Sequence, residues 1–222
     1  MEIVWYGHSC FRINERGKAA VVCDPYDHEV VGYNPLRLKA EIVTVSHDSP
    51  GHNCIKNVKG NPYQINGPGE YEIGGVFITG LSTSHRVRKN NDDGKNDSLV
   101  ANTLYLIDYG GLTIAHLGDM EHVPTQAEVE SLGPVNIALV PVGDGSSLNA
   151  SKAAEVISLL EPNIVIPMHY ATAHAKLKLD PISKFLKEMG LSEVGTQESY
   201  KIASDKDLPE DTQVVILDYM SK

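Results

Sequence analysis

Long apolar runs are missing from the 222-residue sequence, and none approaches the roughly 20 residues that a membrane-spanning helix needs. The first residues, Met1 to Tyr6, are acidic and lack the basic start and apolar core of a signal peptide. We therefore expect a cytoplasmic protein that has no membrane partner.

Cysteine is scarce, with Cys10, Cys23 and Cys54 as the three examples. None of them forms a C-x-x-C pair, and an odd number does not suit a disulfide framework. Reduced thiols in a cytoplasm fit this pattern best, and burial in the core explains Cys10 and Cys23.

Positive charge is also in short supply, because 19 Lys and Arg residues face 29 Asp and Glu residues, for a formal net charge of -10. Such a surface opposes nucleic acid and anionic lipid as partners. A small anionic substrate remains compatible, because a bound metal ion can reverse the field locally. The expected partner is a small molecule, and the sequence leaves a homo-oligomer open.

Short runs rich in Val and Ile, bounded by Gly, Pro, Asn and Asp, predict many strands. The predicted strands are 2–6, 19–23, 42–46, 76–79, 103–107, 112–116, 137–142, 163–168 and 214–218. Helical periodicity and start signals predict helices at 124–131, 150–160 and 181–189. The polar stretch 86–98 is predicted to be a mobile loop. No boundary divides the chain, so we expect one domain over 1–222, of the α/β (α+β) class, with sheets covered by helices.

Histidine and aspartate recur at the ends of the predicted strands. Four such ends carry Ser46-His47-Asp48-Ser49-Pro50-Gly51-His52, then Ser84-His85, His116-Leu117-Gly118-Asp119, and Pro167-Met168-His169-Tyr170. Taken singly, each is better explained as a locally hydrogen-bonded loop residue or a turn. Together they can converge at one edge of a sheet, where imidazole and carboxylate groups would bind a metal ion.

The order of these motifs resembles the metallo-β-lactamase superfamily. The similarity is closer to its small prokaryotic branch of zinc-dependent hydrolases, related to L-ascorbate-6-phosphate lactonase. The supporting segments are Trp5-Tyr6-Gly7-His8-Ser9-Cys10-Phe11, Cys23-Asp24-Pro25-Tyr26, Val45-Ser46-His47, Gly67-Pro68-Gly69-Glu70-Tyr71, His116-Leu117-Gly118-Asp119, Pro141-Val142-Gly143 and Ile166-Pro167-Met168-His169-Tyr170. The resemblance implies a four-layer αββα sandwich and a metal-dependent activity.

The resemblance also implies a degenerate metal site. Against the loop pattern H-x-H-x-D-H, His47 matches the first position and His52 the last, whereas Ser49 and Gly51 replace the second His and the Asp. The implied metal ligands are His47, His52, His85, Asp119 and His169. One ion would keep His47, His85 and Asp119, and the other His52, His169 and Asp119.

Further residues receive roles beside these ligands. Asp24 is expected to support the metal loop through hydrogen bonds, and His8 to serve packing or the same supporting role. His116 is not expected to bind metal. Restoring both lost ligands, by Ser49→His with Gly51→Asp, is expected to strengthen metal binding.

The expected function is a metal-dependent hydrolase of an ester, lactone or phosphoester small molecule. The expected cofactor is a divalent metal, zinc first and manganese or iron as alternatives, with one or two ions held weakly. The catalytic residues are not assigned. The loss of two ligands supports an alternative, a non-catalytic binding or regulatory protein of the same fold. An iron oxidoreductase is a third alternative, disfavoured because no flavodoxin-like second domain is present.

Overall fold

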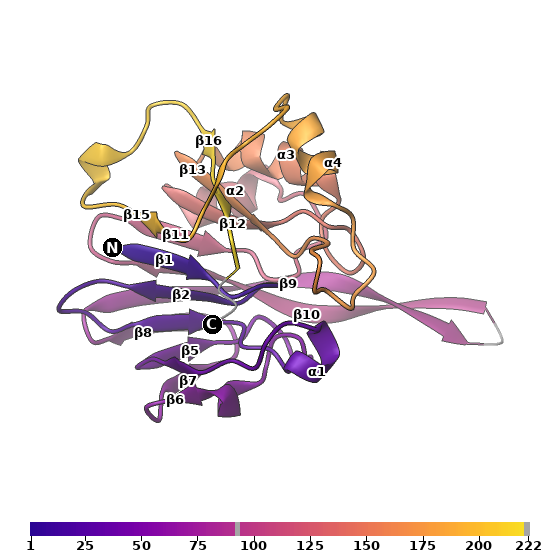
Figure 1. Ribbon diagram of the computed structural model, residues 1–222, viewed down its shortest axis with the longest axis horizontal. Helices are drawn as coiled ribbons and strands as arrows, with labels where there is room; N and C mark the ends of the chain where they lie inside the picture. The colour runs from indigo at the N-terminus through magenta and orange to yellow at the C-terminus, as the bar shows by residue number, and fades with distance from the viewer. Residues whose placement is uncertain (92–93, 220–222) are drawn as a thin grey trace.

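The structure is a computed structural model that describes residues 1–91 and 94–219, without the side chains of 84–91 and 94–99. Two β-sheets stack on each other (Figure 1). The first sheet has the order β15 (Tyr200–Lys201), β1 (Glu2–Trp5), β2 (Phe11–Asn14), β3 (Val21–Cys23), β5 (Ile42–Thr44), β7 (Tyr63–Ile65). The second has the order β16 (Gln213–Val214), β13 (Ile164–Met168), β12 (Ile137–Pro141), β11 (Thr113–His116), β10 (Gly94–Asp108), β9 (Val76–Asn91), β8 (Gly69–Ile73).

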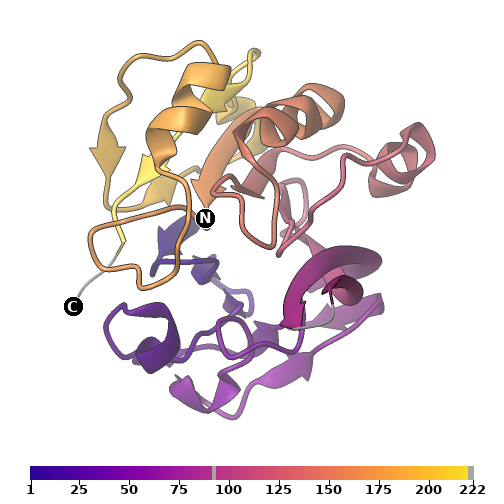
Figure 2. The ribbon, with the colours of Figure 1, turned by 90° about the vertical axis from the view of Figure 1, so that its right-hand side faces the viewer.

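Helices lie on the outer sides of this sandwich. Figures 1 and 2 show α2 (Gln126–Leu132), α3 (Ala150–Leu160) and α4 (Ile182–Glu188) on the side away from the first sheet. The short α1 (His28–Val31) lies on the opposite side of the molecule. Smaller elements are β4 (Leu38–Lys39), η1 (Ile55–Asn57), β6 (Val58–Lys59), β14 (Thr196–Gln197), η2 (Asp205–Asp207) and β17 (Ile216–Leu217). The arrangement confirms the sandwich that the motifs imply.

Alternation along the strands of the first sheet divides its side chains between two cores. Val21 and Cys23 belong to the large hydrophobic cluster that fills the space between the sheets. Val22, which points the other way, joins a second cluster with Val43 and Val31 of α1. Both faces of β3 and β5 are therefore buried, which explains why these two strands read as continuous apolar runs.

Caps fix the helices where the sequence predicts them. The Asn149 side chain accepts a hydrogen bond from Lys152 N and starts α3, as the predicted helix 150–160 requires. Thr125 and Glu128 form a reciprocal capping box at the start of α2.

The prediction of a loop over 86–98 is wrong for the described part of that stretch. The backbone of β9 continues to Asn91 and that of β10 starts at Gly94, with Lys95 opposite Asn90. Antiparallel strands bond through their backbones, so a two-stranded ribbon can form from polar residues, and polarity alone does not reveal it.

Strand direction brings the functional ends together. β1 and β3 are each antiparallel to β2, and β3 is parallel to β5, so β1, β3 and β5 run the same way. In the second sheet β11, β12 and β13 are mutually parallel. Each set of parallel strands therefore ends at one edge of its own sheet, which is where polar groups after the strands can converge.

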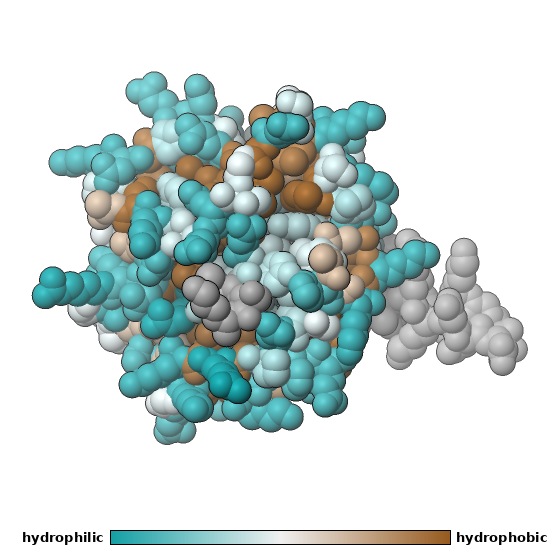
Figure 3. Space-filling view, in the orientation of Figure 1, coloured by the Kyte–Doolittle hydropathy of each residue, from teal (hydrophilic) through white to brown (hydrophobic). Residues whose placement is uncertain are grey.

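The surface of the molecule is mostly hydrophilic on the face shown in Figure 3. In Figure 3, hydrophilic residues surround the outline of this face, and hydrophobic residues show between them mainly in its upper half. Among the described residues, none of the helices has both the length and the apolar character needed to cross a membrane.

Tyr109 connects the two sheets through its hydroxyl group. It follows β10, is buried, and donates a hydrogen bond to the carbonyl oxygen of Ala19 at 2.9 Å. Tyr109→Phe removes the hydroxyl donor, so the buried carbonyl oxygen of Ala19 loses this hydrogen bond. We expect the free energy of unfolding to fall by about 1–2 kcal/mol. Urea denaturation followed by circular dichroism measures this loss.

Tyr63→Phe is the matched control, because the Tyr63 side chain is 55% exposed. It should change the free energy of unfolding by less than about 0.5 kcal/mol. Equal losses in the two variants would show that the Tyr109 bond contributes nothing to the contact between the sheets.

Candidate metal centre

The ends of parallel strands supply the candidate site. Asp24 follows β3, Asp119 comes three residues after β11, and His169 follows β13. Asp24 and His169 adopt left-handed backbone angles, with φ of 44° and 53°. Such angles are uncommon outside glycine and occur where the fold fixes a functional side chain. Here they turn the chain sharply at the strand ends.

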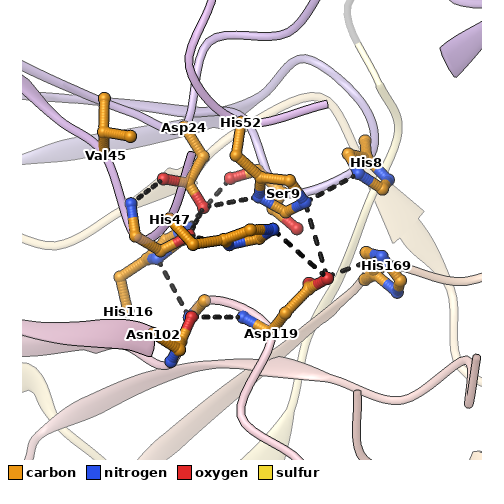
Figure 4. Close-up of polar contacts among 12 residues, drawn as sticks. His8, Ser9, Asp24, Val45, His47, His52, Asn102, His116, Asp119 and His169 are labelled. Carbon is orange, nitrogen blue, oxygen red and sulfur yellow. Dashed lines mark hydrogen bonds and ion pairs between the residues drawn. The ribbon is translucent and has the colours of Figure 1, made fainter. Parts of the chain in front are cut away.

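Asp119 forms the centre of the cluster (Figure 4). Its Oδ2 lies 3.6 Å from His52 Nε2 and 3.9 Å from His47 Nε2. Its Oδ1 lies 3.4 Å from His169 Nε2. All four residues are buried. One carboxylate thus faces three imidazole nitrogens in a space with little access to water.

His52 is held by the carboxylate of Asp24. The Nδ1 atom of His52 lies 2.8 Å from Asp24 Oδ2, so it carries the proton and donates. Asp24 also accepts bonds from the backbone N–H and the hydroxyl of Ser46, at 2.7 and 2.6 Å. In the neutral ring, the proton of His52 is therefore on Nδ1, and the lone pair on Nε2 faces the pocket.

His47 and His169 have the same tautomer for a related reason. The Ser46 hydroxyl gives its proton to Asp24, so at 3.0 Å from His47 Nδ1 it accepts. Ser147 bonds the carbonyl oxygen of Asp144 at 3.2 Å, so it accepts from His169 Nδ1 at 3.2 Å. Each imidazole is tied through Nδ1 and presents a lone pair on Nε2, which is the form that binds metal.

The backbone and one neighbour fix Asp119. Its N–H donates to Asn102 Oδ1 at 3.0 Å, and Ser146 Oγ donates to Asp119 Oδ2 at 2.7 Å. Gly118 precedes it with φ of 58°, and a Cβ there would lie 2.5 Å from Asn102 Oδ1 and 2.6 Å from Ser46 Cβ. Glycine is therefore required at position 118 by both conformation and space.

The charges in the cluster favour metal binding. Burial acts to raise the pKa of the Asp119 carboxyl, but the imidazoles of His169 and His52 outweigh it and hold that pKa well below its usual range. Burial lowers the pKa of His169, although Asp119 acts in the opposite direction. Burial would also lower the pKa of His52, but Asp119 and Asp24 outweigh it and raise that pKa. An ionised carboxylate and a neutral His169 are the forms that bind a metal ion.

The donor atoms fit a divalent ion. Two ligands of a tetrahedral zinc ion, with bonds near 2.1 Å, lie about 3.4 Å apart. The distances of 3.4 and 3.6 Å from Asp119 to His169 and His52 match this value. Among the described side chains, none makes a hydrogen bond to the buried Asp119 Oδ1, and its near neighbour is His169 Nε2 at 3.4 Å. A buried, ionised oxygen without a hydrogen bond is costly in the absence of positive charge, so the site is suited to hold a cation.

The structure brings together four of the predicted ligands, namely His47, His52, Asp119 and His169. The His85 side chain lies outside the described residues. Its backbone belongs to β9 and pairs with Val100, which lines the same pocket. The supporting role predicted for Asp24 agrees with its three hydrogen bonds. His116 bonds the carbonyl oxygen of Ser9 at 2.9 Å, as suits a residue outside the ligand set.

Sequence reasoning underrated His8. Its Nε2 lies 3.1 Å from His52 Nε2, and His8, His52 and His169 form a group whose donor atoms are all within 4.8 Å of one another. Burial lowers the pKa of His8 well below its ordinary value, and His169 and His52 lower it further. The sequence does carry a signal for His8, because this histidine comes shortly after the predicted strand 2–6, as the other site residues follow theirs. Ser146 and Ser147 carry no such signal, since serine pairs are common in loops.

The cluster opens into a pocket of about 370 Å³. Its lining includes Asp119 and four imidazoles, with Val30 and Leu177 as apolar walls. Val30 is 42% exposed, so it is available to a ligand. This volume suits a small molecule.

Comparison with known proteins gives a consistent result. A Beta-lactamase superfamily domain model matches residues 2–169. A Pyrococcus furiosus UPF0173 protein is 28% identical over 215 residues, covering 85% of this chain and 90% of that protein. A Thermoplasma acidophilum protein named UPF0173 metal-dependent hydrolase is 24% identical over 196 residues, covering 78% and 84%.

A solved structure is similar over nearly the whole length. It is a Thermotoga maritima protein named as a Zn-dependent hydrolase of the metallo-β-lactamase superfamily, with a TM-score of 0.75 and 33% identity. The match covers 97% of both chains. The fold, the order of the strand-end ligands and these matches agree, and the chain belongs to the metallo-β-lactamase superfamily.

Proposed function

We propose that this chain is a metal-dependent hydrolase of small ester, lactone or phosphoester substrates. The observation that carries the proposal is the buried Asp119 carboxylate, which the imidazole nitrogens of His169, His52 and His47 face at 3.4, 3.6 and 3.9 Å. Relatives named metal-dependent hydrolase and a structural neighbour named as Zn-dependent support it. We take zinc as the first candidate for the ion.

The residues of this chain would divide the work as follows. His52, Asp119 and His169 would hold the ion. A bound divalent ion supplies Lewis acidity, because it makes water nucleophilic near neutral pH and polarises a carbonyl or phosphoryl oxygen. Asp24 keeps His52 in its metal-binding tautomer. The Ser146 hydroxyl donates a hydrogen bond to Asp119 Oδ2, which favours the ionised carboxylate and orients it.

The pocket favours a compact substrate with an apolar portion. Val30 and Leu177 would contact the carbon skeleton, while the ester, lactone or phosphoester group would reach the buried cluster. A cysteine nucleophile does not fit this pocket. Burial raises the pKa of Cys23 to about 12, and neither Cys23 nor Cys10 lines the pocket.

A non-catalytic role is the competing proposal, motivated by Ser49 and Gly51 at positions where the superfamily pattern has ligands. A regulatory protein needs no metal with open coordination, and it needs no bond cleavage. The two proposals differ in one measurement, which is turnover by the metal-loaded protein.

The test combines metal analysis with a substrate panel. The purified protein is stripped with chelator, reloaded with Zn²⁺, and assayed against a lactone, an aryl ester and a phosphodiester. We expect hydrolysis of at least one class by the loaded protein and loss of that activity on stripping. Asp119→Ala should abolish both metal retention and turnover, because it removes the carboxylate shared by the imidazoles.

His122→Ala is the control, since His122 pairs with Glu128 on the surface at 3.3 Å. It should leave metal content and rate unchanged. Turnover that survives stripping would place the chemistry outside this cluster. Stoichiometric metal without turnover on any substrate class would favour the regulatory protein.

Asp24→Asn tests the support of His52. An amide offers one acceptor oxygen where the carboxylate receives three hydrogen bonds, so at least one of the donors on His52 and Ser46 loses its partner. We expect Zn²⁺ affinity, measured by competition with a chromophoric chelator, to fall about 10–100-fold.

Asp48→Asn is the matched control on the same loop, because Asp48 is exposed and bonds Asn53 instead of an imidazole. Its effect on Zn²⁺ affinity should stay below about threefold, since solvent and salt screen an exposed charge. If both variants lost affinity equally, the effect would reflect general charge and not the orientation of His52.

A further inference from the structure

His8 occupies the space that a side chain at position 51 would need. The superfamily pattern places a ligating Asp at this position, and this chain has Gly51. A Cβ built on Gly51 would lie 3.0 Å from His8 Nε2 and 3.5 Å from His8 Cδ2. This contact is tighter than ordinary van der Waals contact, so Asp at position 51 would require the His8 ring to shift. The loss of the Asp therefore does not leave a hole.

The backbone holds the His8 ring in place. His8 has φ of 53°, and its carbonyl oxygen accepts bonds from Trp5 Nε1 at 3.0 Å and from His169 N at 3.1 Å. Its side chain is buried. Two hydrogen bonds to the carbonyl oxygen and a left-handed angle together fix the backbone from which the imidazole projects.

The His8 nitrogen lies where a ligand to the buried cluster would lie. Its Nε2 is 3.1 Å from His52 Nε2, close to the spacing of about 3.4 Å between two ligands on one tetrahedral ion. Because Nδ1 of His52 donates to Asp24, the neutral ring turns the lone pair of its Nε2 toward His8. The rings of His8 and His169 are also close, with centroids 4.4 Å apart.

We infer that His8 is a metal ligand that replaces the missing loop aspartate. It joins His52 and His169 in a three-imidazole set whose donor atoms lie within 4.8 Å of one another, and Asp119 Oδ1, 3.4 Å from His169 Nε2, lies beside this set. This inference rests on the proposed function, since it concerns the same metal centre. Gly51 then does not cost the site a metal ligand, because His8, in the turn after β1, supplies the donor that the loop has lost.

If His8 is a ligand, restoring Asp at position 51 alone has the opposite effect on Zn²⁺ affinity from the one expected from the loop motif. Gly51→Asp in the native chain would push the carboxylate against the His8 ring, so it should weaken Zn²⁺ binding instead of strengthening it. The same substitution in a His8→Ala background has room and supplies an anionic oxygen to the site. The two positions should therefore compensate for each other.

The experiment is a double-substitution cycle read by Zn²⁺ affinity. His8→Ala should weaken binding by at least about 100-fold, because losing even an outer supporting partner costs about 10–100-fold. His8→Ala with Gly51→Asp should regain at least about tenfold of that loss. Thermal melts of the metal-free proteins show that each variant is folded.

His8→Gln separates a ligand from a hydrogen-bond donor. Its amide can still donate to His52 Nε2 but is a poor zinc ligand, so affinity should fall as in His8→Ala. Zinc X-ray absorption of the loaded variant should show one imidazole fewer than the native protein. This readout does not depend on turnover.

The outcomes are distinguishable. If the native chain binds no Zn²⁺, both the inference and the proposed function are wrong. If the native chain binds Zn²⁺ and hydrolyses a substrate while His8→Gln keeps native affinity and imidazole count, only the inference is overturned. Equal gains from Gly51→Asp with and without His8 would also overturn it.

Discussion

The carboxylate of Asp119, buried among imidazoles, is the interaction on which the rest of the site depends. An ionised oxygen with no hydrogen-bond partner is unfavourable in a dry interior unless positive charge compensates for it. The imidazoles around Asp119 supply part of that compensation, and the arrangement is suited to a metal ion that would supply the rest. The surrounding features follow from this requirement: tied Nδ1 atoms, a glycine at 118, and left-handed turns at Asp24 and His169.

Much of the fold could be predicted from local sequence. The helix 150–160 was recognised because its apolar spacing, its cap at Asn149 and the absence of helix-breaking residues agree. The strand after it was recognised by its continuous apolar run. The ribbon formed by β9 and β10 was not recognised over 86–98. Its pairing there is made by backbone groups, and a polar stretch carries no pattern that separates a strand from a loop.

The sequence predicts which strand ends supply the site residues, but it does not predict how those residues pack against one another. His47, His52, Asp119 and His169 were found because each follows a buried strand, and strand ends of one direction share an edge. His8 follows a strand in the same way. However, the loop motif H-x-H-x-D-H shows only which ligands are missing at positions 49 and 51. It does not show which side chain fills the space that they leave. That His8 lies against Gly51 depends on the path of the chain after β1, and no spacing within the loop reveals it.

Exchanging a carboxylate for an imidazole also changes the charge of the loaded site. A set of three neutral imidazoles and one carboxylate around a divalent ion has a net charge of about +1, whereas a second carboxylate would bring it to zero. This residual charge sits at the base of a pocket in a chain whose formal net charge is -10. The distant surface anions are screened by salt, while the buried charge is not. The proposed exchange would therefore make a bound ion a stronger electrophile and would favour a substrate that carries or develops negative charge at the reacting group.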